Sequence, residues 1–295
     1  MRILNLGSIN IDYVYSVPHF VQAGETLPAA SRLIFPGGKG MNQSIALARA
    51  GAVVVHAGMI GKDGCDLLEV LQEAGVDTGL ITLCEVPTGH TIIQVTPEGE
   101  NCILLFPGAN KEINRAYVDK VLSSFDKDDI LILQNEVSSV AYAMKAAKDK
   151  GMKIAFNPSP FEAEVKSYPL ELVDFWLLNE IEGLALTGKE NPDDILTTMG
   201  AIYPGAVIVL TLGENGVLCY ASGNVLSHPS YKTTVVDTTA AGDTFTGYFI
   251  SSISMNKEVE EALRLASIAA SISVSRQGAS VSIPLMDEVV GVEFS

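Results

Sequence analysis

The chain has 295 residues, 47 % of them hydrophobic and 18 % charged, which is enough to build a large core in one α/β domain or in two smaller ones. Its formal net charge of −16 argues against nonspecific binding to nucleic acids or anionic membranes, which depends on basic patches. No apolar run approaches the roughly 18 residues of a membrane-spanning helix, and the first residues are too polar for a secretory signal, so we expect a cytoplasmic protein without membrane contact.

Most of the chain alternates between short apolar strands and helical patterns. In chain order the pattern predicts strands at 3–7, 53–60, 130–133, 153–156, 175–178 and 207–211, and helices at 41–50, 138–150, 181–186, 193–203, 242–254 and 259–274. Strands that are apolar on both sides are buried on both faces. The sequence therefore predicts an α/β fold, with a mostly parallel central sheet covered by helices on both sides.

Four segments do not fit that scheme, because they alternate apolar and polar residues in the manner of half-exposed strands. They are 11–17, 27–35, 91–96 and 101–106, and residues 97–100 between the last two read Pro-Glu-Gly-Glu, which favours a hairpin turn. We expect a small β-sheet inserted into the α/β body. It could serve as a lid that excludes water, or be an ordinary surface meander.

The stretch 237–244 reads Asp-Thr-Thr-Ala-Ala-Gly-Asp-Thr and leads into an apolar helix. The small residues Ala240, Ala241 and Gly242 allow a ligand to approach the backbone, and the free N–H groups of a helix beginning there would attract an anion such as phosphate. Asp243 could take a proton from a hydroxyl nucleophile. The alternative is a helix start whose small residues serve packing alone.

A glycine-rich turn at 36–42 contains Gly38, Lys39 and Asn42. It matches neither the phosphate-binding pattern G-x-x-x-x-G-K-[ST] nor the dinucleotide pattern G-x-G-x-x-G. Backbone and side-chain groups in such a turn can still bind a polyhydroxyl ligand. A turn without a function is the alternative.

Polar side chains follow several of the predicted buried strands. Asn10 and Asp12 come after the first strand, and others stand at 134–136, 157–158, 179–182 and 211–213. Turn chemistry explains any one of these alone. Because open α/β sheets bind ligands at the carboxyl ends of their strands, five such positions together predict a site at that edge.

These motifs occur in a characteristic order, and together they are specific. Over essentially its whole length the chain resembles the ribokinase-like (PfkB) carbohydrate kinase family. The motifs are G-S-I-N-I-D at 7–12, P-G-G-K-G-M-N at 36–42, G-E-N at 99–101, G-A-N at 108–110, N-P-S-P at 157–160, N-E-I-E at 179–182, T-L-G-E-N-G at 211–216 and D-T-T-A-A-G-D-T-F at 237–245.

The resemblance implies a single three-layer α/β/α kinase domain over 1–295, with lid segments at about 10–36 and 88–107. It implies transfer of a phosphoryl group from ATP to an alcohol of a sugar. Within the family the chain looks most like the members that phosphorylate the 5-hydroxyl of D-ribose. Another sugar, a sugar acid or a nucleoside is the alternative substrate.

Two other classes of function are disfavoured. A regulator that binds sugar or nucleotide without catalysis would be expected to lack the base or the anion hole, and the run 240–243 is intact. A nicotinamide dehydrogenase would need the dinucleotide pattern that is missing.

The resemblance also implies roles for individual residues. Asp243 matches the catalytic base, and Ala240, Ala241 and Gly242 match the anion hole for the transferred group. Lys39 matches a position close to the phosphates and the substrate. The positions that bind the sugar hydroxyls are matched by Asn10, Asp12, Gly38, Asn42 and Glu136.

For the nucleotide and its metal ions, Asn179, Thr211 and Gly213 match ATP-binding positions, together with Gly242. Glu182 matches a residue that holds Mg²⁺ through water. A loop that binds K⁺, mostly through carbonyl oxygens, is matched by Asp237, Thr239, Ser273, Arg276, Gly278 and Ser282. A homodimer formed through the lid is a further implication. Met41 departs from the pattern, since a small residue is usual there, and it could reshape the sugar pocket.

Overall fold

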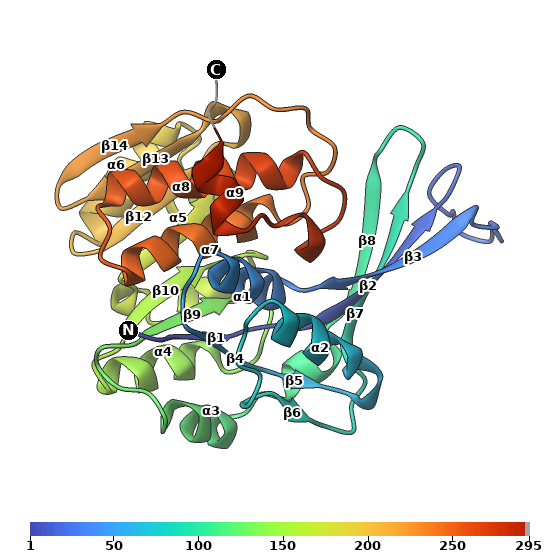
Figure 1. The fold of residues 1–295 in the computed structure, drawn as a ribbon, viewed down its shortest axis with the longest axis horizontal. Coiled ribbons are helices and arrows are strands. Elements are labelled where there is room, and N and C mark those ends of the chain that lie inside the picture. The colour runs from blue at the N-terminus through green and yellow to red at the C-terminus, as the bar shows by residue number, and fades with distance from the viewer. Residues whose placement is uncertain (293–295) are drawn as a thin grey trace.

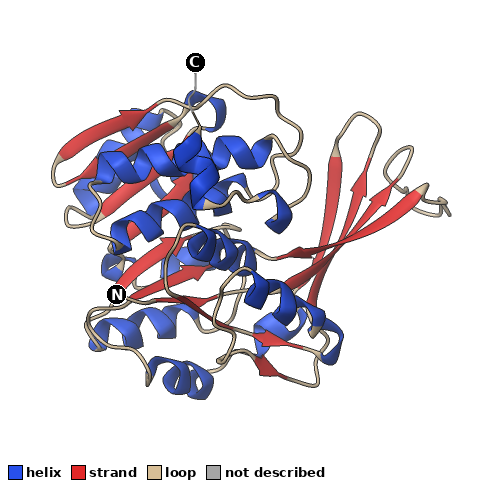
Figure 2. Ribbon diagram, in the orientation of Figure 1, coloured by secondary structure: helices blue, strands red, loops and turns tan. Residues whose placement is uncertain are grey.

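The computed structural model describes residues 1–292; the last three residues of the expected domain, 293–295, lie outside the described residues. Figure 1 shows a layered body of helices and strands from which a narrow β-sheet extends to one side. Figure 2 shows the same view with the strands in red, and the central strands lie between two groups of blue helices.

The helices and strands follow the chain in an order that alternates in the body and is interrupted by the small sheet. The strands are β1 (Ile3–Leu6), β2 (Asn10–Ser16), β3 (Ser31–Gly37), β4 (Val54–Ala57), β5 (Met59–Ile60), β6 (Thr82–Leu83), β7 (Gly89–Val95), β8 (Asn101–Phe106), β9 (Ile130–Gln134), β10 (Lys153–Asn157), β11 (Phe175–Asn179), β12 (Val207–Thr211), β13 (Val217–Ala221) and β14 (Asn224–His228). The helices are α1 (Lys39–Arg49), α2 (Asp66–Glu73), α3 (Arg115–Leu122), α4 (Val140–Asp149), α5 (Glu180–Thr187), α6 (Pro192–Ile202), α7 (Ala241–Ser254), α8 (Val259–Val274) and α9 (Met286–Gly291).

The large sheet, within the described residues, has the strand order β14-β13-β12-β11-β10-β9-β1-β4. Neighbouring strands from β4 to β12 are parallel, and β13 and β14 add an antiparallel edge. The carboxyl ends of the parallel strands therefore meet at one edge of the sheet, where a ligand crevice is expected.

The core has two parts, one on each face of the large sheet, because alternate residues of each strand point to opposite faces. In β9, Ile130 and Ile132 join a cluster that contains apolar side chains of α1, α7 and α8. Leu131 and Leu133 join a second cluster with side chains of α3, α4 and α6. This confirms the three-layer α/β/α arrangement that the sequence predicts.

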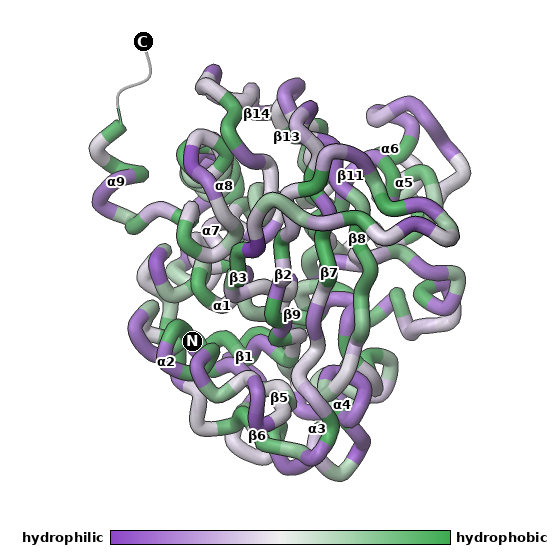
Figure 3. The backbone as a smooth tube through the Cα atoms, turned by 90° about the vertical axis from the view of Figure 1, so that its right-hand side faces the viewer, coloured by the Kyte–Doolittle hydropathy of each residue, from purple (hydrophilic) through white to green (hydrophobic). Residues whose placement is uncertain are grey.

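The small sheet has the strand order β3-β2-β7-β8. β2 pairs in parallel with β7, and the outer pairs β2–β3 and β7–β8 are antiparallel. Figure 3 looks onto this sheet and shows green, hydrophobic stretches along β7 and β8. The turn after β7 is closed by the Gly99 amide, which donates to the carbonyl of Thr96.

The structure differs from the predicted elements in a few places. The strand expected at 27–35 begins at Ser31, because Pro28 has no N–H for pairing and residues 17–30 form the connection from β2. The strand expected at 53–60 is broken into β4 and β5 at Gly58. None of the helices within residues 1–292 has the length and apolar character needed to cross a bilayer.

Candidate active site

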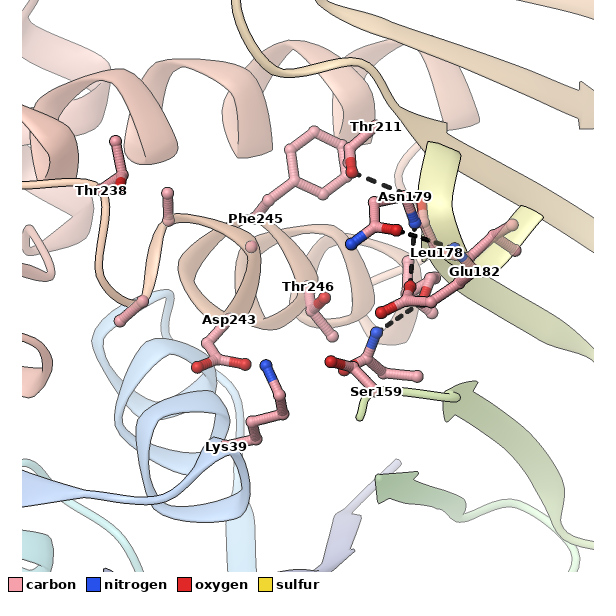
Figure 4. A pocket seen from close by; sticks show the side chains of 15 residues that line it. Lys39, Ser159, Leu178, Asn179, Glu182, Thr211, Thr238, Asp243, Phe245 and Thr246 are labelled. Carbon is pink, nitrogen blue, oxygen red and sulfur yellow. Dashed lines mark hydrogen bonds between the residues drawn. The ribbon is translucent and has the colours of Figure 1, made fainter. Parts of the chain in front are cut away.

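A cavity of about 230 Å³ opens at the carboxyl edge of the large sheet, where it is lined by β10, β11, β12 and the start of α7. Figure 4 shows Lys39 reaching toward Asp243, with Asn179 and Glu182 across the cavity. Eight of the residues singled out from the sequence line it: Lys39, Asn179, Glu182, Thr211, Ala240, Ala241, Gly242 and Asp243.

Helix α7 begins with its first turn open to this cavity. Ala240, the residue before the helix, has left-handed backbone angles (φ 61°, ψ 8°), and no side chain caps the helix start. For a residue with a Cβ this conformation costs about 1–2 kcal/mol. In the described part of the chain the amides of Gly242 and Asp243 have no recorded partner. The helix start therefore offers unpaired N–H groups and partial positive charge to an anion.

The Asp243 carboxylate lies in this first turn and is 6 % exposed. Its Oδ2 accepts a hydrogen bond from Nδ2 of Asn42 at 3.1 Å, and its Oδ1 accepts from Nε2 of Gln43 at 2.9 Å. Both amides come from α1, which packs against α7. A carboxylate held on two sides but facing a cavity is placed to accept a proton from a ligand.

Lys39 introduces a positive charge among three carboxyl groups. Burial lowers the pKa of Lys39, but the carboxylates of Asp243, Glu136 and Glu182 outweigh that effect and the pKa is raised. Burial raises the pKa of Glu136 and of Glu182, although Lys39 partly opposes both shifts. One cation therefore faces an excess of negative charge, and this favours binding of a further cation.

Asn179 and Glu182 form the start of α5. The Asn179 Oδ1 accepts from the amide of Glu182 at 3.0 Å, and Glu182 Oε2 accepts from the amide of Asn179 at 2.9 Å, so the two make a capping box. The N-x-x-E motif thus has a structural role as well as a place on the cavity wall. Thr211 ends β12 beside it, and its hydroxyl donates to the carbonyl of Leu178 at 3.3 Å.

The remaining sugar-binding candidates gather next to this cavity, around the end of β1 and the start of α1. Glu136 Oε2 accepts from the hydroxyl of Ser8 and from the amide of Lys39 at 2.9 Å. The Asn10 side chain accepts from Nδ2 of Asn110 at 2.8 Å. Asn42 carries a buried Oδ1 that has no hydrogen-bond donor among the described residues.

Asp12 lies on β2 beside the glycine-rich turn. Its Oδ1 accepts from the hydroxyl of Thr91 at 2.6 Å, and burial raises its pKa although this hydrogen bond opposes the shift. A Cβ on Gly37 would come within 1.9 Å of the Asp12 carboxylate, so only glycine fits there. Gly38 follows with φ 91° and precedes α1.

The candidate cation loop is joined to the segment before α7 by Asp237. Its carboxylate accepts from the amides of Thr239 at 2.9 Å and Gly278 at 3.0 Å. Burial raises the pKa of Asp237, but hydrogen bonds from the side chain and amide of Thr239 and from the amide of Gly278 outweigh it, and the pKa is lowered. Ser282 donates to the carbonyl of Ala279 at 2.8 Å. The guanidinium of Arg276 pairs with Glu288 at 2.6 Å, so this side chain faces α9.

Two further positions singled out from the sequence do not line the cavity either. Gly213 is in a short 3-10 turn after β12 and is not among the residues that line it. Met41 is fully buried in the core cluster formed by α1, α7 and α8.

Sequence reasoning missed Gln43, which binds Asp243, and Ser8, which binds Glu136. Ser8 stands inside the first motif, and that position could have drawn attention to it. The contact of Gln43 with Asp243 depends on the packing of α1 on α7, which no local sequence pattern shows.

The family model of the pfkB family carbohydrate kinases matches residues 2–286 of this chain. The chain belongs to the pfkB family. The carboxylate and open helix start described above thus lie in a carbohydrate-kinase domain. The family resemblance recognised from the motifs is confirmed.

Within the pfkB family the chain is similar to proteins named ribokinase. It is 37 % identical to the ribokinase of Haemophilus influenzae, over 97 % of this chain and 96 % of that one. Its fold matches the ribokinase of Cryptococcus neoformans in complex with ADP, with a TM-score of 0.86, 33 % identity and 98 % of each chain covered. It also matches the Arabidopsis thaliana ribokinase complexed with ribose and ATP, with a TM-score of 0.88, 27 % identity and coverage of 98 % and 97 %.

Proposed function

We propose that this protein is an ATP-dependent sugar kinase that phosphorylates the 5-hydroxyl of D-ribose. The observation that carries the proposal is the meeting of Asp243 and the open amides of α7 at one cavity. Its membership of the pfkB family and its similarity to ribokinases, one of them complexed with ribose and ATP, support ribose as the substrate.

In this proposal the Asp243 carboxylate takes the proton of the sugar hydroxyl as its oxygen attacks the γ-phosphorus of ATP. The bond from phosphorus to the β,γ-bridging oxygen breaks, and ADP leaves. The open amides at the start of α7 and the ammonium of Lys39 stabilise the negative charge of the transferred group. Positioning and charge stabilisation supply most of the rate enhancement in phosphoryl transfer.

The sugar would lie between the glycine-rich turn and the small sheet. Asn10, Asp12, Gly38, Asn42 and Glu136 would bind its hydroxyl groups. The buried unpartnered Oδ1 of Asn42 supports this assignment, because a sugar hydroxyl would satisfy it. The small sheet, built from the segments at about 10–36 and 88–107, would act as the lid of a single domain spanning 1–295.

ATP would extend over the wall formed by Asn179, Thr211 and Gly213, with its terminal phosphate at Gly242. In residues 1–292 no three His, Cys, Asp or Glu side chains converge as a metal cluster. Mg²⁺ usually takes only one or two carboxylates and completes its shell with water and phosphate oxygens. Glu182 fits that requirement, and the excess negative charge around Lys39 fits a divalent cation. When bound with ATP, Mg²⁺ would neutralise phosphate charge.

The substrate assignment is tested by measuring ADP release in a coupled assay with a panel of alcohols. D-Ribose should give the highest kcat/KM, and 2-deoxyribose, hexoses, sugar acids and nucleosides should be poorer. Phosphorus NMR of the product should show a 5-phosphate. A nucleoside or sugar acid with a higher kcat/KM would replace ribose as the substrate while keeping the kinase assignment.

We also propose that K⁺ binds in the loop that contains Asp237, Thr239, Ser273, Arg276, Gly278 and Ser282, mainly through carbonyl oxygens. The buried hydroxyls of Ser273 and Ser280 have no partner among the described residues, which supports a missing ligand in this loop. Replacing K⁺ by Na⁺ should lower kcat by about an order of magnitude, because the bound charge lies beside the anion hole. Choline chloride sets the baseline, and equal kcat values in K⁺ and Na⁺ would contradict the site.

A homodimer formed through the small sheet is a further proposal. The edge strand β8 exposes Ile103, Leu104, Leu105 and Phe106, and such a strand readily pairs with another chain. Sedimentation velocity should give about twice the monomer mass for the native chain and a monomer for Leu104→Lys. Val53→Lys is the control, because Val53 is 64 % exposed on the body. A native monomer at micromolar concentration would rule the dimer out.

A cytoplasmic location is proposed on two grounds. The reaction consumes ATP, and the four cysteines are free thiols in the structure, as expected in a reducing compartment.

A further inference from the structure

A chain of buried amide side chains runs from Asp243 to the centre of the large sheet. Gln43 donates to Asp243 Oδ1 at 2.9 Å, and its Oε1 accepts from Nε2 of Gln134 at 2.7 Å. Gln134 Nε2 also donates to Oδ1 of Asn5 at 3.1 Å. Gln43 and Asn5 are 0 % exposed and Gln134 is 1 % exposed. The three side chains come from α1, β9 and β1, so three elements meet behind the carboxylate.

The donor and acceptor roles in this chain follow from chemistry. An ionised Asp243 can only accept, so Gln43 must turn its NH₂ group toward it and its oxygen toward Gln134. Gln134 must then present its own NH₂ group, with one hydrogen for Gln43 and one for Asn5. Turning the Gln134 amide over would set its oxygen against two other oxygens. The hydrogen bond from Gln134 therefore fixes the orientation of the Gln43 amide.

A second set of hydrogen bonds holds Asn5, at the end of the amide chain that is farthest from Asp243. Asn5 Nδ2 donates to the carbonyl of Gly40 at 2.7 Å and to the hydroxyl of Ser44 at 2.8 Å. Ser44 bonds Nδ1 of His56 at 2.8 Å, and Nε2 of His56 faces the carbonyl of Gly7 at 3.3 Å. Burial lowers the pKa of His56 to about 4, so the ring is neutral and donates to Gly7. Ser44 then donates to His56, which fixes Asn5 with its oxygen toward Gln134.

We propose that Gln43 and Gln134 are positioning residues for the reaction, and that they hold the Asp243 carboxylate in the orientation in which it receives the proton. The inference rests on the proposed function, in which Asp243 is the base. Gln134 does not touch Asp243 and acts only through Gln43.

The unpartnered oxygen of Gln134 separates this role from simple packing. Among the described residues its buried Oε1 has no donor, and such an atom costs about 1–3 kcal/mol. Methionine has nearly the same size and would remove this oxygen, but it would also leave Oε1 of Gln43 and Oδ1 of Asn5 without their donor. The role of Gln134 thus lies in its two Nε2 hydrogens, which orient the neighbouring amides, and not in its oxygen.

The test compares Gln43→Met, Gln134→Met and the double variant with the native chain. We expect kcat to fall about 10- to 100-fold in Gln43→Met and less in Gln134→Met, because a carboxylate displaced by about an ångström loses that much rate. The KM values for sugar and ATP should stay within about threefold, since neither residue contacts a substrate in the proposal. The double variant should be no slower than Gln43→Met, because Gln134 acts through Gln43.

The pH profile supplies a readout that packing alone would not move. A donor that favours the charged carboxylate is lost in Gln43→Met, so the acid limb of kcat should move to higher pH. Other charged groups facing Asp243 are Lys39 on α1, Glu136 after β9 and Glu182 on α5, and all are unchanged in the variant. Ser251→Ala is the control, because this buried α7 hydroxyl bonds the carbonyl of Ala50 away from the cavity.

Two results would overturn the inference. One is a Gln43→Met enzyme with the kcat and acid limb of Ser251→Ala. The other is a double variant whose loss is the sum of the single losses in free energy. If Gln43→Met does not fold, Gln134→Met decides alone. An acid limb of kcat that moves to higher pH supports the inference, and a native acid limb overturns it. Asp243→Asn measured in parallel separates the two proposals: if it keeps the native kcat, the base assignment fails, whereas a silent Gln43→Met beside an inactive Asp243→Asn removes only the positioning role.

Discussion

Asp243→Asn is expected to lower kcat by about 10²- to 10⁴-fold, which is the usual contribution of a positioned general base. Asparagine has nearly the shape of aspartate but cannot take the proton of the sugar hydroxyl. The fold should survive, because asparagine has nearly the same volume and keeps one oxygen that can accept from Asn42 or Gln43. Affinity for the sugar should change only a few-fold. Coupled ADP release gives kcat, and calorimetric titration with ribose gives the affinity.

Asp66→Asn is the matched control, since Asp66 is exposed in the first turn of α2 and lies outside the cavity. It should keep the native kcat. Native turnover by Asp243→Asn would remove this residue as the base. Loss of both turnover and sugar affinity would instead assign it to binding.

The sequence predicts the residues of the candidate site more completely than it predicts the individual helices and strands. Lys39, the pair Asn179 and Glu182, and Asp243 come from three distant parts of the chain, yet each stands at the end of a strand or the start of a helix. In a parallel sheet these ends share one edge, so the sequence pattern already implies that they meet. The structure brings them around one cavity.

Local sequence signals also mark other elements, among them β13, β14 and α3. β13 and β14 are joined by Ser222 and Gly223, which have φ angles of 51° and 83°. Two positive φ angles are typical of a tight hairpin turn, and Ser-Gly before Asn224 is such a signal. Helix α3 likewise begins after Asn114, whose side chain accepts from the amide of Tyr117.

The amide chain behind Asp243 could not be predicted, because it depends on packing rather than on local pattern. Gln43 follows Asn42 directly and looks like another helix residue, and Gln134 looks like a polar end of a strand. Only the crossing of α1 over β1 and β9 brings the three amides together. Long-range hydrogen bonds of this kind leave no periodicity in the sequence.

Lys39→Met is expected to lower kcat by about 10²- to 10³-fold, the usual loss when one group that stabilises transition-state charge is removed. Methionine retains the length of the side chain and removes its charge. In the proposed reaction Lys39 faces the transferred phosphoryl group, so its loss should reduce kcat more than the affinity for ribose. Steady-state rates at saturating ATP and calorimetric titration with ribose separate the two effects.

The stability of Lys39→Met gives a second readout that is independent of catalysis. Without the cation, the pKa values of Glu136 and Glu182, already raised by burial, should rise further. The folded state then binds more protons than the unfolded state over the range above pH 4.5 or so, the usual value for glutamate. Since stability falls with pH wherever the folded state binds more protons, the Tm deficit of the variant should grow from pH 5 toward pH 8.

Lys148→Met is the control for both readouts, because Lys148 pairs with Asp174 at 2.8 Å away from the cavity and is similarly half-buried. It should keep the native kcat. Losing Lys148 leaves Asp174 unpaired near the surface, where solvent screens the charge, so its Tm deficit should vary little over the same pH range. A Lys39→Met variant with native kcat would contradict the role of Lys39 at the phosphates. A Tm deficit that does not grow as the pH rises would show that the carboxylates do not depend on its charge.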